Sequence, residues 1–333
     1  MKAFILDHYG KNDSVRIGEM PDPEVQENDV LVQVHAAGVN PLDYKIRDGE
    51  FKLILPYRLP VILGNEVAGI VVRVGSRVRR FRPGDEVYAR TEKDQIGAFA
   101  EFISLNEDAA AIKPKALTME EAASIPLVGL TAWQVLIERA GLKKGQKVLI
   151  HAGSGGVGTF AIQLAKHLGA IVATTTSTEN LDMVKRLGAD IAIDYTKDDF
   201  ANVLSGYDVV LNSLGTETLN KSLQVLKPGG KLISISGPPD PSFAKDLGVS
   251  WILGQAMRFL SYRIRMEAKR HRVSYSFLFM APSGDQLREI TSLVDSGIIR
   301  PVVDQVLPFD SIEEALAKVE QGHVKGKVVV KVR

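Results

Sequence analysis

Three glycines at a fixed spacing are the residues of this sequence that point most directly to chemistry. Gly153, Gly155 and Gly158 form the pattern G-x-G-x-x-G, with an apolar run at residues 148–152 before them and an amphipathic helical pattern after them. The first glycine permits a tight turn, the second lets the backbone approach a pyrophosphate, and the third lets helix and strand pack closely. The helix N-terminus then offers unpaired N–H groups and a positive dipole end. This context predicts a binding site for the pyrophosphate of a dinucleotide.

Two other interpretations of the same stretch fail on spacing. A P-loop requires Gly-Lys-Ser/Thr at the start of the helix, whereas Gly158 is followed by Thr159 with no lysine between them. A nucleophile elbow requires G-x-S-x-G, whereas Ser154 lies directly between Gly153 and Gly155. The glycines therefore indicate neither a nucleoside triphosphatase nor a serine nucleophile.

Strand and helix patterns alternate on both sides of the glycine turn. Strands are expected at residues 148–152, 171–176, 191–194, 208–214, 231–236 and 274–280, and helices at residues 179–187, 198–204, 218–226 and 251–272. Such alternation predicts an α/β fold with a parallel, doubly wound Rossmann sheet.

The two ends of the chain have a different, β-rich pattern. Residues 1–110 are strand-like and rich in turns, helical periodicity begins at a capping-box-like Thr118–Glu121, and a second helix is expected at residues 130–140. The tail from residue 282 is more similar to the first part than to the middle. We therefore expect a discontinuous β-rich domain, 1–123 plus 282–333, with a nucleotide-binding domain at 124–281 inserted in it.

Composition limits the class of protein. The 333 residues contain 41 Lys plus Arg, 40 Asp plus Glu and no cysteine, so disulfides, thiolate catalysis and thiolate-bound zinc are excluded. The balanced charge gives no global attraction to nucleic acid or to anionic membranes. The first ten residues are too weakly apolar for a signal peptide, and no run approaches the roughly 18 apolar residues of a membrane span. A cytoplasmic, soluble enzyme is the resulting expectation.

Residues 251–272 are amphipathic and locally basic. A membrane-surface or nucleic-acid helix is one interpretation, and a packed helix with a solvated basic face is the favoured one. The strand expected at 274–280 is apolar enough to pair with a second subunit at the edge of the sheet, which predicts a homodimer.

Several ordered motifs resemble one family across nearly the whole chain. They are residues 37–43 (Ala-Gly-Val-Asn-Pro-Leu-Asp), 64–69 (Gly-Asn-Glu-Val-Ala-Gly), 81–87 (Phe-Arg-Pro-Gly-Asp-Glu-Val), 129–132 (Gly-Leu-Thr-Ala), the glycine turn and 326–328 (Gly-Lys-Val). Together they resemble the medium-chain dehydrogenase/reductase superfamily, in its zinc-free quinone oxidoreductase and enone reductase branch. The resemblance implies a GroES-like domain beside a Rossmann domain, with the active site in a cleft.

The sequence departs from the zinc-dependent members of that superfamily. Asn40 and Asn65 stand where those enzymes carry a ligand cysteine and a ligand histidine, and amides are poor zinc ligands. The six histidines (8, 35, 151, 167, 271 and 323) show no paired ligand spacing. We expect no metal site, and hydride delivery to an already electrophilic carbon of a quinone or enone stays feasible.

The cofactor is expected to be NADPH. NAD enzymes place an acidic residue after the second strand to bind the ribose 2′-hydroxyl, but residues 174–178 are Thr-Thr-Thr-Ser-Thr, and the first carboxylate is Glu179. Hydroxyls there could donate to a 2′-phosphate, or Ser177 could simply cap the next helix. By resemblance Tyr195 contacts that phosphate and Lys327 lies in a matching Gly-Lys, whereas Asn180 replaces a lysine common in relatives.

The resemblance also implies the substrate end of the site. Asn40 and Thr131 would lie near the nicotinamide, with Asp43, Tyr44 and Lys45 around the cleft. Tyr44 could protonate the α-carbon and Lys45 could offset enolate charge, or both could be surface residues. Phe51, Tyr57 and Phe279 are candidates to line an apolar pocket, although core packing is their commoner role.

The sequence supports one candidate site and three functional hypotheses. The catalytic candidates are Asn40, Tyr44 and Lys45, and the cofactor-binding candidates are Asn40, Thr131, Ser154, Gly155, Gly156, Val157, Thr176, Ser177, Tyr195, Ser236, Phe279 and Lys327. The leading hypothesis is NADPH-dependent, metal-independent reduction of quinones or α,β-unsaturated carbonyls. The alternatives are an enoyl-thioester or other activated-alkene reductase, and an NADPH-binding protein with a structural or RNA-binding role.

Overall fold

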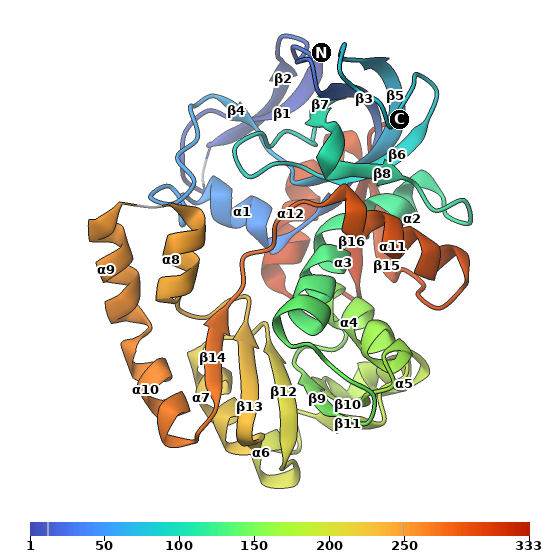
Figure 1. The fold of residues 1–333 in the computed structure, drawn as a ribbon. Coiled ribbons are helices and arrows are strands. Elements are labelled where there is room, and N and C mark those ends of the chain that lie inside the picture. The colour runs from blue at the N-terminus through green and yellow to red at the C-terminus, as the bar shows by residue number, and fades with distance from the viewer. Residues whose placement is uncertain (12, 249) are drawn as a thin grey trace. The chain divides into compact units, whose positions relative to one another are not determined.

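The chain folds into two compact units in a computed structural model, which describes residues 1–11, 13–248 and 250–333 (Figure 1). Unit 1 comprises Met1–Leu130 and Ala281–Arg333, and unit 2 comprises Thr131–Met280. The expected boundaries were 123/124 and 281/282. Within the described ranges, no helix is long and apolar enough to cross a membrane.

Unit 1 is built from two β-sheets and a few helices. Its strands are β1 (Lys2–Leu6), β2 (Val15–Glu19), β3 (Asp29–Val39), β4 (Val61–Ile62), β5 (Glu66–Val74), β6 (Glu86–Arg90), β7 (Phe102–Asn106), β8 (Ala110–Ile112), β15 (Val303–Pro308) and β16 (Lys327–Lys331). Its helices are α1 (Pro41–Arg47), α2 (Met119–Ala123), α11 (Gly284–Asp295) and α12 (Ile312–Gln321), with short 3-10 turns at Glu107–Ala109 and Phe309–Ser311.

The larger sheet of unit 1 brings distant parts of the chain to one end. Its strand order is β15-β16-β3-β5-β6-β8, and β7 also pairs with β3. Antiparallel pairing places the end of β3 beside the start of β16, the start of β5 beside the end of β3, and the end of β6 beside the start of β5. Residues that follow or begin these strands therefore converge at a single edge. The three-stranded sheet β2-β1-β4 completes the unit.

Two short helices of unit 1 begin at N-terminal caps. The backbone N–H of Asn40 donates to Asp43 Oδ2 at 2.7 Å, and Pro41 occupies the first turn of α1, where its missing N–H costs nothing. The capping box expected from Thr118 is confirmed at α2, because Thr118 and Glu121 exchange side-chain and backbone hydrogen bonds.

Unit 2 alternates strands and helices. Its strands are β9 (Lys147–Ile150), β10 (Ile171–Thr176), β11 (Ile191–Asp194), β12 (Tyr207–Asn212), β13 (Leu226–Ser234) and β14 (Ser274–Phe277). Its helices are α4 (Gly156–His167), α5 (Leu181–Arg186), α6 (Phe200–Val203), α7 (Thr216–Val225), α8 (Pro241–Leu247), α9 (Trp251–Leu260) and α10 (Tyr262–Arg270), with a 3-10 turn at Thr178–Asn180. The boundary between the units falls within α3 (Pro126–Trp133), which continues as a π-helical turn at Gln134–Arg139.

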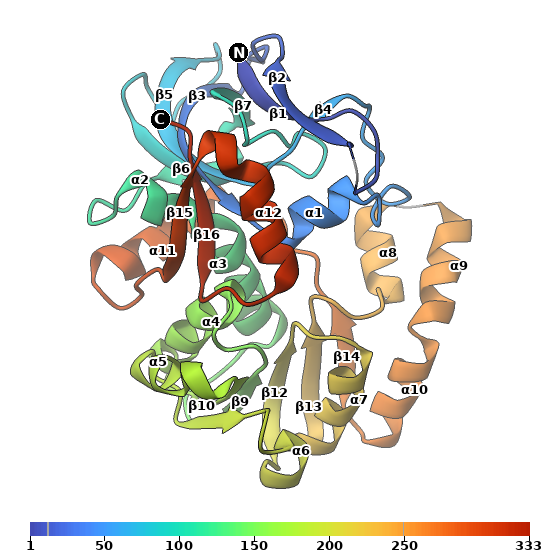
Figure 2. The ribbon, with the colours of Figure 1, turned by 180° about the vertical axis from the view of Figure 1, so that it is seen from behind.

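The expected parallel, doubly wound sheet is confirmed in unit 2. The strand order is β11-β10-β9-β12-β13-β14, and every pairing is parallel. Chain order reverses between β9 and β12, which is the position where such sheets bind ligands outside the strand carboxyl ends. Helix α7 packs against β12 and β13, and Figure 2 shows it on one face of the sheet.

Three helical segments differ most from the sequence expectation. The helix expected at 130–140 begins earlier, at Pro126, because proline is favoured in a first turn. Helix α8 was not among the expected helices, and Asp240 caps it by accepting from the N–H of Phe243. The segment 251–272 forms two helices separated at Ser261. Met257, Ile264 and Ala268 are packed, as the favoured interpretation expects, whereas much of the remaining apolar surface is exposed.

Candidate functional site

The glycine turn of unit 2 has the geometry that a pyrophosphate site requires. A Cβ at Gly158 would lie 2.3 Å from the carbonyl oxygen of Ala152, and one at Gly153 would lie 2.0 Å from Thr174 Oγ1. Both positions therefore need glycine for packing. At Gly155, by contrast, the described part of the chain brings only the Ala152 oxygen near, at 3.4 Å, so its free side is open to a ligand. Ala152 itself has φ 51°, a left-handed conformation unfavourable for alanine.

Most of the predicted cofactor residues lie at the carboxyl end of the unit 2 sheet. Those after β9 are Ser154, Gly155, Gly156 and Val157, and the last two open α4 with free backbone N–H groups. The others are Thr176 and Ser177 at the end of β10, Tyr195 after β11, Ser236 after β13 and Phe279 after β14. Parallel strands therefore bring residues up to 125 positions apart, from Ser154 to Phe279, to one edge.

The end of β10 presents hydroxyl groups without a free carboxylate beside them. Thr176 Oγ1 is buried and has no hydrogen-bond partner among the residues described. Its neighbour across the sheet is Asp194, which sequence reasoning did not consider. Asp194 accepts from Thr178 at 2.5 Å and from Thr196 at 2.7 Å and pairs with Lys197 at 3.1 Å, and the hydrogen bonds from Thr178 and Thr196 lower the pKa of its carboxyl. Its charge is thus already compensated within the strand ends.

His151 is a structural residue of unit 2. Its ring nitrogens lie 3.1 Å from Thr175 Oγ1 and 2.9 Å from Ser222 Oγ. Burial lowers the pKa of the imidazole to about 3, so the ring is neutral at physiological pH. Both nitrogens are used in packing the first strand of the sheet.

A buried polar cluster occupies the converging strand ends of unit 1. Lys327 Nζ donates to Asn40 Oδ1 at 2.6 Å, to Glu66 Oε1 at 2.6 Å and to the carbonyl oxygen of Val39 at 2.9 Å. Asn40 Nδ2 donates to Glu66 Oε1 at 2.8 Å and to the carbonyl oxygen of Gly38 at 3.3 Å. Both amide hydrogens of Asn40 are therefore engaged, and its oxygen retains one acceptor position.

Asp43 and Asn65 extend this cluster. Asn65 Nδ2 donates to Asp43 Oδ1 at 2.6 Å, and both side chains are fully buried. Burial raises the pKa of Asp43 to about 7, although the hydrogen bonds from Asn65 and Asn40 act in the opposite direction. The Asp43 carboxyl is therefore divided between its protonated and ionised forms near neutral pH.

Arg90, like Glu66, was not among the candidate residues chosen from the sequence. Its side chain is buried at the end of β6, it donates to the carbonyl oxygen of Thr91, and burial lowers the pKa of the guanidinium. Its Nε, together with Thr91 Oγ1 and Asn65 Oδ1, has no partner within the part of the chain that the structure describes. The only signal in the sequence was a charged residue that closes an apolar strand pattern.

The remaining candidates have mixed surroundings. Tyr44, Phe51 and Tyr57 are partly buried against the core of unit 1, and the Tyr57 hydroxyl donates to the carbonyl oxygen of Lys93 at 2.6 Å. Lys45 is partly exposed and pairs with Glu50 at 3.2 Å. The structure thus brings Asn40 and Lys327 together in unit 1 but does not join Tyr44 or Lys45 to their cluster.

In unit 2, Thr131 is buried in α3, and the ring of Phe279 lies 6.0 Å from that of Phe243. Ser236 Oγ donates to the carbonyl oxygen of Leu214 at 2.8 Å, and Tyr195 is exposed.

The donor set of unit 1 does not suit a zinc ion. The two positions that would supply zinc ligands hold Asn40 and Asn65, and the ammonium of Lys327 already occupies the oxygen of Asn40 and one oxygen of Glu66. A cation there opposes a second, divalent cation. Across the residues described, no group of three or more His, Asp or Glu side chains could hold a metal.

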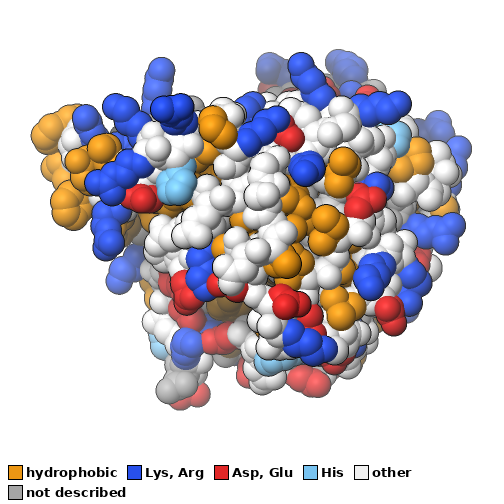
Figure 3. Space-filling model, turned by 90° about the horizontal axis from the view of Figure 1, so that it is seen from below, with side chains coloured by type: hydrophobic (Ala, Val, Ile, Leu, Met, Phe, Trp, Pro, Cys, Tyr) orange, Lys and Arg blue, Asp and Glu red, His pale blue; other side chains and the backbone are white. Residues whose placement is uncertain are grey.

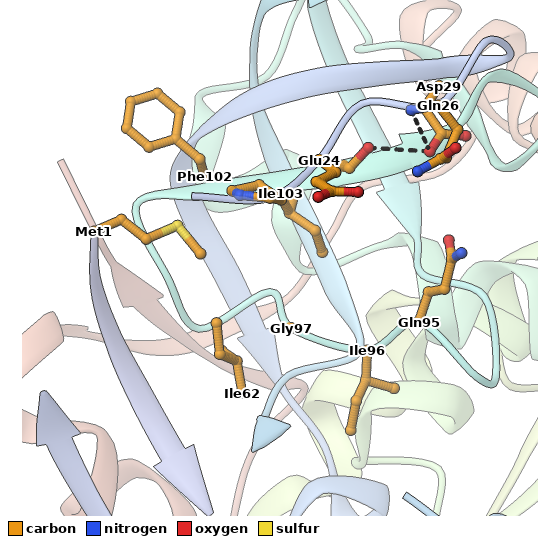
Figure 4. Close-up of a pocket in the computed structure, with 12 residues that line it drawn as sticks. Met1, Glu24, Gln26, Asp29, Ile62, Gln95, Ile96, Gly97, Phe102 and Ile103 are labelled. Carbon is orange, nitrogen blue, oxygen red and sulfur yellow. Dashed lines mark hydrogen bonds between the residues drawn. The ribbon is translucent and has the colours of Figure 1, made fainter. Parts of the chain in front are cut away.

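A separate pocket of about 280 Å³ lies elsewhere in unit 1 (Figure 4). Among its lining residues, Asp29 Oδ2 accepts from the N–H of Gln26 and from Ser104 Oγ. Its carboxylate is thus partnered locally, and the pocket shares no residue with the predicted site.

Comparison with known proteins gives consistent matches over the whole chain. The alcohol dehydrogenase GroES-like domain matches residues 26–115, and the zinc-binding dehydrogenase family matches residues 187–330. The mitochondrial NAD(P)H oxidoreductase RTN4IP1 of Danio rerio is 38% identical over 355 residues, covering 100% of this chain and 91% of the relative. The chloroplastic NADPH-dependent alkenal/one oxidoreductase of Arabidopsis thaliana is 36% identical, covering 99% of this chain and 79% of the relative. The structure of the quinone oxidoreductase from Coxiella burnetii is similar with a TM-score of 0.87 at 33% identity, covering 100% of this chain and 99% of that one.

Proposed function

Because this chain belongs to the quinone oxidoreductase branch of the medium-chain dehydrogenase/reductase superfamily, we propose that it reduces quinones or α,β-unsaturated carbonyls with NADPH. The observation that carries the proposal is the edge of the unit 2 sheet, where an open glycine turn and a row of hydroxyls stand together. Bound there, the nicotinamide cofactor supplies the hydride, and the protein supplies binding and alignment.

Different residues of unit 2 bind different groups of the cofactor. The free N–H groups of Gly156 and Val157 bind the pyrophosphate at the N-terminus of α4, and Gly155 leaves room for it. The hydroxyls of Thr176 and Ser177, with Tyr195, bind the 2′-phosphate. Support for NADPH over NADH comes from these hydroxyls and from Asp194, whose carboxylate is paired with Lys197 and accepts hydrogen bonds from Thr178 and Thr196. Ser236, Phe279 and Thr131 line the remainder of the cofactor site.

In unit 1 the polar cluster positions Asn40. With both amide hydrogens engaged, Asn40 acts on the nicotinamide end only as an acceptor, through Oδ1, and Lys327 fixes the orientation of that amide. Lys327 is thus a positioning residue in its present contacts, and a direct contact with the cofactor stays a prediction.

Proton delivery after hydride transfer is assigned to Tyr44 or to solvent. Tyr44 is partly buried and could donate to the α-carbon of an enone. Lys45, which pairs with Glu50, would offset charge on the enolate oxygen only after leaving that pair. The roles of Tyr44 and Lys45 can therefore be tested separately.

The deciding experiment is a screen of NADPH oxidation by the full-length protein treated with a chelator. The substrates are 1,4-benzoquinone, 9,10-phenanthrenequinone, 1-penten-3-one, trans-2-hexenal and an enoyl thioester, each repeated with NADH. Turnover of a quinone or enone with a higher kcat/KM for NADPH is the expected result. Turnover of the thioester alone would favour the activated-alkene alternative, and cofactor binding without turnover would favour a non-catalytic role.

Two further features are proposed with this function. β14 lies at the end of the unit 2 sheet, which supports a homodimer formed by pairing of this edge with a second copy. Sedimentation as a monomer at micromolar concentration would contradict it. The cysteine-free sequence is compatible with the reducing cytoplasm, and that location stays a prediction.

A further inference from the structure

Helices α9 and α10 of unit 2 carry large apolar side chains on a surface that nothing in the described chain covers. Trp251 is 77% exposed, Ile252 is 75% exposed and Phe259 is 82% exposed. Leu260, Tyr262 and Met266 are also exposed, and we call these six side chains the outer face. Figure 3 shows hydrophobic side chains gathered with Lys and Arg side chains on this projecting part of the molecule. Apolar side chains in such a group, rather than scattered singly, mark a binding surface.

Packing of the two helices does not need the outer face. Met257, Ser261, Ile264 and Ala268 are buried and recur every three or four residues, so they form the inner seam. Helix α10 packs with this seam against β14 and α7, and α9 packs against α8. The outer apolar side chains are therefore available for something other than the fold.

The charge of the same segment is strongly one-sided. Between residues 251 and 272 the sequence holds six Lys and Arg, at positions 258, 263, 265, 269, 270 and 272, and one acid, Glu267. Glu267 already bonds to Arg270 at 2.9 Å. The whole chain holds 41 basic and 40 acidic residues, so the remainder has 35 basic and 39 acidic residues and is slightly acidic. Cations and aromatic side chains thus share one pair of helices.

We propose that the outer face of α9 and α10 binds the surface of an anionic phospholipid membrane. A helix with Trp, Phe and Leu on one face and Arg or Lys beside them lies in the plane of the lipid headgroups, with its apolar side chains among the acyl chains. The arginines then meet the negative surface potential of the membrane. This inference does not rest on the proposed reaction.

Two other occupants fit the surface less well. A second copy of the chain, paired about a twofold axis, would set the cationic patch against itself, which is repulsive. A nucleic acid would satisfy the arginines but would offer no partner to the aliphatic Ile252 and Leu260. The membrane satisfies both components at once.

The test is flotation of the full-length protein with unilamellar vesicles at low and high salt. One set of vesicles contains phosphatidylcholine alone, and the other contains phosphatidylcholine mixed with phosphatidylglycerol. The expected result is binding to the anionic vesicles and little binding to the neutral ones. The double variant W251S/F259S should lose most of the binding, and R258Q/R263Q should lower the partition coefficient by about thirtyfold at low salt.

Matched controls separate this surface from general properties. V203S changes another exposed apolar residue of unit 2, and R82Q changes an exposed arginine of unit 1, and neither should alter binding. The sequence has two tryptophans, Trp133 and Trp251, so W133F leaves Trp251 as a single reporter. Its emission should shift to the blue with anionic vesicles and be quenched by brominated acyl chains.

Four outcomes would overturn the proposal. They are equal binding of neutral and anionic vesicles, unchanged binding by W251S/F259S, dissociation of a dimer by that variant in sedimentation, and salt-sensitive RNA binding that it abolishes. The third would assign the surface to a second copy of the chain, and the fourth would assign it to nucleic acid.

Discussion

Replacing Lys327 by Met removes the cation from the buried cluster of unit 1 while keeping a side chain of similar length. Lys327 and Glu66 are almost completely buried, and their contact at 2.6 Å is joined by hydrogen bonds to Asn40 and Val39. The variant leaves Glu66 charged and buried, and among the described residues it retains the donors Asn40 Nδ2 and the N–H of Leu127. Removing one partner of a buried pair typically costs about 3–5 kcal/mol, which is the expected loss for unit 1.

The control is Lys331→Met on the same strand. Lys331 is exposed and pairs with Glu120 at 3.1 Å, so its loss should cost about 1 kcal/mol or less. Both tryptophans lie in unit 2, and their fluorescence would not report on unit 1. Hydrogen exchange of the β3 and β16 amides, followed by mass spectrometry, measures the affected unit directly. For Lys327→Met these amides should exchange faster by about two to four orders of magnitude.

The double variant K327M/E66Q tests the electrostatic cause. Neutralising Glu66 removes the unpaired buried charge, so part of the lost protection against hydrogen exchange should return. The gain is partial because the hydrogen bond from the N–H of Leu127 to residue 66 is weakened. Equal exchange in K327M and K331M would refute the reasoning. Failure of E66Q to restore any protection would refute its electrostatic part.

Three further predictions concern the cofactor turn, a buried carboxyl and the proton donor. Gly155→Val should leave the stability of unit 2 unchanged but raise the Kd for NADPH by about a hundredfold in titration calorimetry. Gly158→Ala should destabilise unit 2 by about 1–3 kcal/mol, because the new Cβ would clash with backbone atoms. Equal effects of the two variants on stability would contradict the assigned geometry. Burial raises the pKa of Asp43 to about 7, so the stability of unit 1 should fall as pH rises from about 4 to about 7, by on the order of 4 kcal/mol, and Asp43→Asn should remove this fall. The measurement is urea unfolding of the wild-type protein and of Asp43→Asn at several pH values, followed by hydrogen exchange of unit 1 amides. Parallel pH profiles of the two proteins would contradict the prediction. Tyr44→Phe should lower kcat with an unchanged KM for NADPH, and an unchanged kcat would leave proton delivery to solvent.

The sequence predicted the architecture of unit 2 well, because its signals are local. Strands β10 and β11 were expected at their observed bounds, and the glycine turn specified the junction of β9 and α4. Helix α8 escaped prediction although Asp240 and Pro241 are residue types typical of a helix start, and the bond from the Phe243 N–H to Asp240 shows that the helix is capped. Local pattern could not show that Trp251 and Phe259 face outward, since amphipathicity does not say what covers an apolar face.

The polar cluster of unit 1 was the least predictable part of the site. Lys327 lies 261 positions from Glu66, and only the pairing of β16 with β3 brings them together. The resemblance directed attention to Lys327 as a cofactor residue, whereas its present partners are Asn40, Glu66 and a carbonyl oxygen. Arg90 belongs to no sequence motif. It stands out only because its side chain is buried while its Nε lacks a hydrogen-bond partner among the described residues, and neither property can be read from the sequence.

The position of β16 has a consequence for the order in which the protein is made. The strand lies between β15 and β3 in the sheet, yet it is synthesised after the whole of unit 2, which occupies residues 131–280. On the ribosome, unit 2 has every strand of its sheet while β3 still has an open edge at residues 36–39 and Glu66 still lacks its cation. A nascent chain at this stage combines a finished Rossmann sheet with an unpaired, aggregation-prone edge. Chaperone dependence during synthesis should therefore concentrate on the first 130 residues and end when the last strand emerges.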